Sequence, residues 1–142
     1  MQVESAQFGI LEVADDDIVV FEGGLLGFPG SSRFLMIEAD RPGYLWLQSI
    51  DEPQLSFLAT HPWDFFPDYE FELTDEDQAD LEIATLENAD VLCLLSIHDD
   101  TDGMAVTINL LGPLVINTIN RQGRQVVLSG SDYEASAPLV AA

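Results

Sequence analysis

The sequence contains no lysine, and its four arginines stand against 26 aspartates and glutamates, so the formal net charge is -22. No Lys or Arg occurs between Arg41 and Arg121. A field of this sign repels nucleic acid and anionic membranes and attracts basic partners. Screening over about 8 Å at physiological salt confines that attraction to close approach. Adaptation to a salty cell and a function-specific acidic surface both fit this composition.

Cysteine and long apolar runs are nearly absent as well. The single Cys93 lies in the apolar run 91–97 and cannot form an intramolecular disulfide, so we expect a reduced thiol in the core. No apolar run reaches the roughly 20 residues of a membrane span. The N-terminal residues lack the basic and then apolar pattern of a signal peptide. These features predict a cytoplasmic protein without membrane association.

Motifs for catalysis and cofactor binding are missing too. The glycines of segment 22–30 lack the dinucleotide-binding spacing, and a phosphate-binding loop would need a lysine. His61 and His98 have no second ligand at metal spacing. The acidic turn 99–103 lacks the glutamate of a calcium loop, which makes a hairpin turn the preferred interpretation. We therefore predict no catalytic residue, no cofactor and no metal.

Short β-like segments, separated by Gly, Pro and Asp turns, make up most of the chain. Continuous apolar runs at 18–21 and 91–97 predict strands covered on both faces, whereas strict alternation at 104–110 predicts one apolar face. The expected strands are 2–7, 8–13, 18–21, 34–37, 44–48, 55–59, 91–97, 104–110, 114–117 and 125–129. This pattern predicts a mostly β single domain, an antiparallel β-barrel-like fold or a two-sheet sandwich, at 1–130. A polar, small-residue C-terminal tail would follow at 131–142.

One short helix is expected near 75–86. Thr74 is a plausible N-cap, and the carboxylates of 75–77 would lie in the first turn, where the helix dipole favours them. Its apolar face would comprise Ala79, Ile83 and Leu86.

The stretch 61–83 combines aromatic rings with acids that no basic residue offsets. We expect two or three of its rings to lie in the core, with Trp63 and Phe66, beside Pro62 and Pro67, partly exposed. Exposed aromatics with a charged rim are typical of protein interfaces. The candidate partner-binding residues are Trp63, Phe66, Asp68, Asp75, Glu76, Asp77 and Asp80.

Several stretches, taken in order along nearly the whole chain, resemble the bacterial flagellar assembly factor FliW. The most specific is Asn109–Asn117, since this family places an N-L-x-x-P-[LIV]-x-[IV]-N string near its C-terminal end. The other matching stretches are Phe21–Pro29, Leu47–Ser49, Pro62–Leu73 and Val127–Ser129 with Tyr133.

This resemblance implies a β-barrel-like protein without catalytic activity. Its family binds the C-terminal region of flagellin in the cytoplasm and also binds the translational regulator CsrA, which it antagonises without occupying the RNA site. Flagellin capture would release CsrA, and flagellin secretion would free the factor again. We expect a monomer when free, without direct nucleic-acid contact. The alternatives are an acidic nucleic-acid mimic and a small-ligand-binding β-barrel unrelated to flagella.

Overall fold

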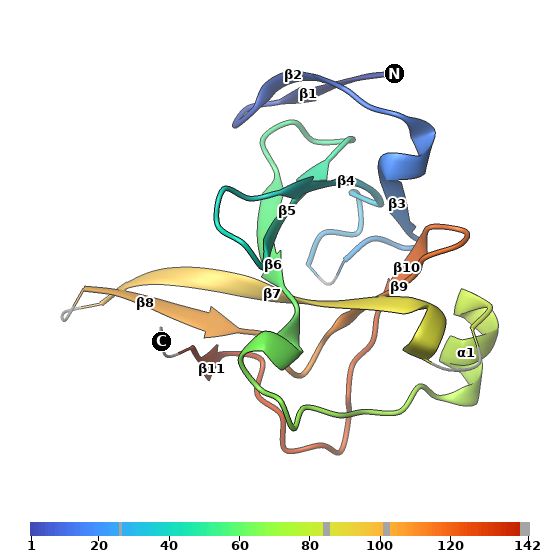
Figure 1. The fold of residues 1–142 in the computed structure, drawn as a ribbon, viewed down its shortest axis with the longest axis vertical. Helices are drawn as coiled ribbons and strands as arrows, with labels where there is room; N and C mark the ends of the chain where they lie inside the picture. The colour runs from blue at the N-terminus through green and yellow to red at the C-terminus, as the bar shows by residue number, and fades with distance from the viewer. Residues whose placement is uncertain (26, 84–85, 101–102, 140–142) are drawn as a thin grey trace.

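The computed structural model describes residues 1–25, 27–83, 86–100 and 103–139, and its strands curl into a closed barrel (Figure 1). The barrel runs β3-β4-β5-β6-β7-β9-β10 and closes where β10 pairs with β3. Its strands are β3 (Ile18–Phe21), β4 (Arg33–Glu38), β5 (Tyr44–Ser49), β6 (Ser56–Thr60), β7 (Ala89–Asp100), β9 (Leu114–Asn117) and β10 (Gln122–Gln125). Neighbouring strands are antiparallel except β3 and β10, which are parallel. The predicted barrel-like single domain is confirmed, and the alternative of a two-sheet sandwich is wrong.

Elements outside the barrel extend or cover it. Strands β8 (Gly103–Ile108) and β11 (Ala137–Pro138) continue the sheet beyond β7, and β1 (Gln2–Ser5) forms a separate hairpin with β2 (Gly9–Glu12). The 3-10 helices are η1 (Asp15–Asp17), η2 (Pro62–Asp64) and η3 (Leu86–Asn88). In the described part of the chain, the single α-helix is α1 (Asp75–Leu81).

None of the helices among the described residues has both the length and the apolar character that crossing a membrane requires.

Strand β7 is the centre of the sheet, as its continuous apolar run predicts. It pairs with β9 through Ala89–Leu92, with β6 through Cys93–Leu95 and with β8 through Leu95–Asp100. Strands β7 and β8 remain paired up to Asp100 and Gly103, as in a hairpin, and residues 101 and 102 of the predicted acidic turn lie outside the described residues.

Two hydrophobic clusters occupy the two faces of β7. Leu92 belongs to the inner cluster, which fills the barrel, whereas Cys93 and its alternate neighbours belong to an outer cluster. The inner cluster is Val19, Phe21, Leu25, Phe34, Leu47, Ala59, Leu92, Leu114 and Ile116. The outer cluster is Tyr69, Leu81, Ile83, Val91, Cys93, Leu95, Ile108, Leu110, Val115, Val126, Leu128 and Ala137. Burial on both faces explains why β7 is apolar at consecutive positions.

The helix differs from its prediction in length and in its buried face. Thr74 is the N-cap, since its hydroxyl accepts a hydrogen bond from the Asp77 amide at 3.1 Å. The helix ends at Leu81, because Glu82 adopts a left-handed conformation with φ of 57°. The helix buries Asp77 and Leu81, whereas Ala79 of the predicted apolar face is exposed. Ile83 is buried beyond the helix, and the side chain of Leu86 lies outside the described part of the structure.

The C-terminal region also differs from its prediction. The last barrel strand is Gln122–Gln125 rather than 125–129, and beyond it Val126 and Leu128 donate backbone hydrogen bonds to Pro113 and Leu111. Residues 131–139 of the predicted tail pack on the domain, since β11 pairs with β8 and Ala137 is buried in the outer cluster.

Candidate functional site

The aromatic stretch between β6 and α1 lies across the outer cluster and holds it in place. The Tyr69 side chain is buried, and its hydroxyl donates a hydrogen bond to the Leu110 carbonyl at 2.6 Å. The Tyr69 ring contacts the rings of Phe71 and Tyr133, with centroids 5.7 Å and 4.6 Å apart. This segment is therefore a lid over the outer face of β7, and Tyr69 is its anchor.

The aromatic candidates are placed at the edge of this lid. Trp63 is 38% exposed, and its indole nitrogen donates to the Tyr69 carbonyl at 2.6 Å. Phe66 is half-buried and packs against the outer cluster, and Asp68 is exposed. Trp63 and Asp68 thus present an aromatic and an acidic group to solvent, whereas Phe66 presents only part of its ring.

The acids of α1 fall into two pairs with different surroundings. Asp75 and Glu76 are exposed at the start of the helix. Asp77 is largely buried, and its carboxylate lies 3.0 Å from Nε of Arg124 on β10. Asp80 forms a second ion pair with the same guanidinium. Arg124 carries one positive charge against these two carboxylates and so offsets only part of their charge. Asp80 is exposed, whereas Asp77 offers little of its side chain to a partner.

Two buried groups, the Cys93 thiol of β7 and the Tyr69 hydroxyl of the lid, are held in their neutral forms. Burial raises the pKa of the Cys93 thiol to about 12, although a hydrogen bond with Tyr69 acts in the opposite direction. Burial, with a smaller contribution from Cys93, also raises the pKa of the Tyr69 hydroxyl well above its ordinary value. Cys93 is a free, buried thiol, as expected, and it is not activated as a nucleophile.

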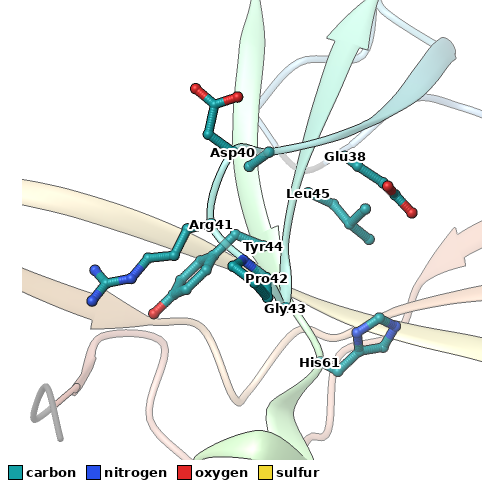
Figure 2. Close-up of a pocket in the computed structure, with 9 residues that line it drawn as sticks. Glu38, Asp40, Arg41, Pro42, Gly43, Tyr44, Leu45 and His61 are labelled. Atoms are coloured by element: carbon teal, nitrogen blue, oxygen red, sulfur yellow. The ribbon is translucent and has the colours of Figure 1, made fainter.

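A hollow of about 410 Å³ flanks the turn between β4 and β5 (Figure 2). Its walls include Glu38, Leu45 and His61, and the side chains of Arg41 and Tyr44 lie on the other side of the turn in this view. His61 Nε2 lies 3.0 Å from Asp90 Oδ1, with both side chains partly exposed. An exposed pair of this kind contributes at most about 1 kcal/mol to stability. Among the described residues, no group of three or more His, Cys, Asp or Glu side chains is arranged to hold a metal.

The sequence interpretation missed an apolar groove of about 390 Å³ on the outer side of the barrel. It is lined by Ala39, Asp40, Arg41, Tyr44, Trp46, Leu58, Leu95, Ile97, Val106 and Leu139. Tyr44 links the groove to the lid, because its ring lies 6.1 Å from that of Phe65. The sequence signal was the alternation along β7, which carries the outer apolar face beyond Leu95 to Ile97.

The 109–117 string has a structural role. Asn109 accepts a hydrogen bond from the Gly112 amide at 2.9 Å and closes the turn between β8 and β9. Asn117, at the other end of the string, donates from Nδ2 to the Leu81 carbonyl at 2.8 Å and so satisfies the C-terminus of α1. The string therefore fixes both the turn whose Leu110 carbonyl accepts from Tyr69 and the end of α1.

The Leu47–Ser49 stretch is structural as well. Gln48 is fully buried; it accepts a hydrogen bond from Ser5 Oγ at 2.7 Å and donates to the carbonyls of Ser49, Pro53 and Leu55. This amide connects the β1–β2 hairpin to the barrel.

Comparison with known proteins agrees with this arrangement. A family model described as FliW protein matches residues 2–139. A flagellar assembly factor FliW from Magnetococcus marinus is 38% identical over 99% of this chain and 85% of that protein, and one from Natranaerobius thermophilus is 38% identical over 98% and 92%. A crystal structure of the flagellar assembly factor FliW superimposes with a TM-score of 0.88 at 30% identity, covering 99% of this chain and 98% of the other. The chain belongs to the FliW family of flagellar assembly factors.

Proposed function

We propose that this protein is a non-enzymatic cytoplasmic factor that couples the level of flagellin to its translation. It binds the C-terminal region of flagellin, and it binds and antagonises the translational regulator CsrA. Flagellin captures the factor and leaves CsrA on its mRNA, whereas export of flagellin returns the factor to CsrA. Membership of the family of flagellar assembly factors supports this proposal.

The observation that carries the CsrA half of the proposal is the exposure of acidic side chains, together with one partly exposed indole, along the lid and the start of α1. Asp68, Asp75 and Glu76 are exposed, and Trp63 lies on the same lid that leads into α1. A surface of this sign attracts a basic RNA-binding protein and sets both the rate and the specificity of its association. No Lys or Arg occurs from 42 to 120, and the cation that contacts α1 is Arg124, which pairs with Asp77 and Asp80 rather than with Asp75 or Glu76.

The filled barrel argues against the small-ligand alternative. Phe21, Phe34 and Leu47 are fully buried in the inner cluster and occupy the space that an interior ligand would need. The nucleic-acid-mimic alternative differs in mechanism, because a mimic would occupy the RNA groove of CsrA and compete directly with RNA.

The charge-reversed variant with Asp75→Lys and Glu76→Lys tests the acidic surface. Because both side chains are exposed, it should weaken CsrA binding at least about tenfold and lower its salt dependence, while thermal unfolding shifts little. Calorimetric titration at low and high salt measures this. The matched control reverses Asp15 and Asp16 in η1, away from α1. Unchanged affinity and salt slope in the α1 variant would exclude this surface as the CsrA site.

RNA competition separates the two modes of antagonism. We expect the factor to lower the affinity of CsrA for RNA. We also expect that increasing RNA concentration does not displace the factor from CsrA in direct proportion. Strict competition, in which RNA and the factor exclude each other at one site, would favour the mimic.

A further inference from the structure

The apolar groove on the outer side of the barrel is left open by the residues that the structure describes. Leu58, Leu95 and Val106 form its floor, and each packs on or belongs to the outer cluster. Ile97 lies two residues after Leu95, on the same face of β7, and is 52% exposed. The lid covers one part of the outer cluster, and the groove residues Leu95 and Ile97 continue along β7 where it pairs with β8.

Single exposed apolar side chains are common on soluble proteins, whereas convergent ones mark binding surfaces. Here apolar side chains from β5, β6, β7, β8 and the C-terminal strand region line one hollow. Polar groups are few, chiefly Asp40 and Arg41 at the rim, and the Arg41 guanidinium lies over the Tyr44 ring at 5.9 Å from its centroid. A small polar ligand would need more convergent hydrogen-bonding groups than this lining offers.

The charge of the molecule limits what covers the groove. A second copy of the chain also carries a formal charge of -22, so electrostatic repulsion between the two copies opposes self-association through this face. A partner segment with an apolar stripe and neutral or basic flanks meets no such opposition. An amphipathic helix supplies such a stripe, with anchors at i, i+3 or i+4, and i+7 that fit an apolar groove.

We propose that this groove binds the apolar stripe of an amphipathic helix from the C-terminal region of flagellin. This assignment rests on the proposed function, from which we take flagellin as the partner. The shape and the apolar lining of the groove indicate that the bound segment is an amphipathic helix. Ile97 lies at the open part of the groove and Trp46 on its wall. The acidic start of α1 is then a separate surface, at the end of β7 away from the hairpin (Figure 1).

The test is the variant Ile97→Arg, titrated calorimetrically with full-length flagellin. Ile97 is half exposed, so the variant should fold, and we expect binding to weaken about thirtyfold, as for a residue central to an interface. The matched control is Ile119→Arg, a 79% exposed isoleucine in the turn between β9 and β10, which should keep its affinity. Full affinity of Ile97→Arg would overturn the groove assignment alone. A wild-type protein that does not bind flagellin would overturn the proposed function, and the assigned occupant with it.

Tryptophan fluorescence gives a second readout that does not depend on a groove substitution. The chain has two tryptophans, so the variant Trp63→Phe leaves only Trp46, on the groove wall. Addition of a tryptophan-free flagellin C-terminal peptide should shift Trp46 emission to shorter wavelength as the indole leaves water. Binding of that peptide by calorimetry with no change in Trp46 emission would overturn the assignment.

Discussion

At the scale of single residues, Arg124 is the side chain on which the placement of α1 most depends. It contacts both Asp77 and Asp80 from β10, and Asp77 is the less exposed of the two carboxylates. The sequence shows the four acids of 75–80 as equivalent, because nothing local to the helix reveals a cation 44 residues further along the chain. Thr74 was predictable as the N-cap, since its partner, the Asp77 amide, lies within the same turn.

Removing the Arg124 guanidinium should destabilise the fold. In Arg124→Gln, the Asp77 carboxylate stays largely buried and loses its charge partner, so we expect a loss of about 1–3 kcal/mol in the free energy of unfolding. The matched control is Arg33→Gln, which breaks the more exposed pair with Asp51 and should cost no more than about 1 kcal/mol. Urea denaturation compares the two. Equal losses would mean that Arg124 does not hold the helix.

The buried thiol predicts a specific alkaline weakness. The thiol of the unfolded chain ionises near its ordinary pKa of 9.0, whereas in the fold the pKa of Cys93 is raised to about 12. Between these values the folded state binds more protons than the unfolded state, so stability should fall as pH rises, by up to about 1.4 kcal/mol per pH unit.

The Cys93→Val variant should flatten this decline between about pH 8.5 and about pH 9.5, below the ordinary pKa of 10.0 at which Tyr69 of the unfolded chain ionises. Urea denaturation of both proteins across this range measures the slope. A variant that declines as steeply as the wild type would show that Cys93 does not titrate in this way.

At the scale of elements, the lid and the turn of 109–113 form one interlocking unit. Tyr69 reaches from the lid to the Leu110 carbonyl, and Asn109 closes the turn that presents it. The individual strands were largely predictable, because their alternation and turn residues are local. The left-handed Glu82 that ends α1 was not, since a glutamate carries no signal for this conformation. The groove could not be predicted from local sequence patterns, because the residues that line it are spread along the chain from 39 to 139.

Deleting the hydroxyl of Tyr69 should therefore lower the free energy of unfolding more than deleting the hydroxyl of the neighbouring Tyr133. Tyr69→Phe leaves the buried Leu110 carbonyl without this donor, and we expect a loss of about 1–3 kcal/mol in the free energy of unfolding. Tyr133→Phe removes exposed hydrogen bonds to the backbone of Glu70 and is the matched control, with a loss below about 1 kcal/mol. A ranking in the reverse order, by thermal or urea unfolding, would contradict the anchoring role of Tyr69.

At the scale of the whole molecule, the charge of -22 acts on stability as well as on recognition. Carboxylates on one compact domain repel one another, and salt screens this repulsion. The composition reveals the excess charge directly, whereas only the structure shows which acids are paired and which are open.

The free energy of unfolding should accordingly rise as sodium chloride increases from about 10 mM to about 0.5 M, over which the screening length falls severalfold. The Asp75→Lys, Glu76→Lys variant is the comparison, because its smaller net charge should reduce the salt effect. A stability independent of salt would mean that self-repulsion is not a significant term in this fold.

The central claim is that one acidic barrel exchanges flagellin for CsrA. The most direct measurement is calorimetric titration of the wild-type protein with CsrA, first alone and then with flagellin at saturation. We predict that each partner binds alone and that saturating flagellin weakens CsrA binding at least about tenfold, which corresponds to a coupling of about 1.4 kcal/mol. Unchanged CsrA affinity in the presence of bound flagellin, or binding of neither partner, would contradict the exchange.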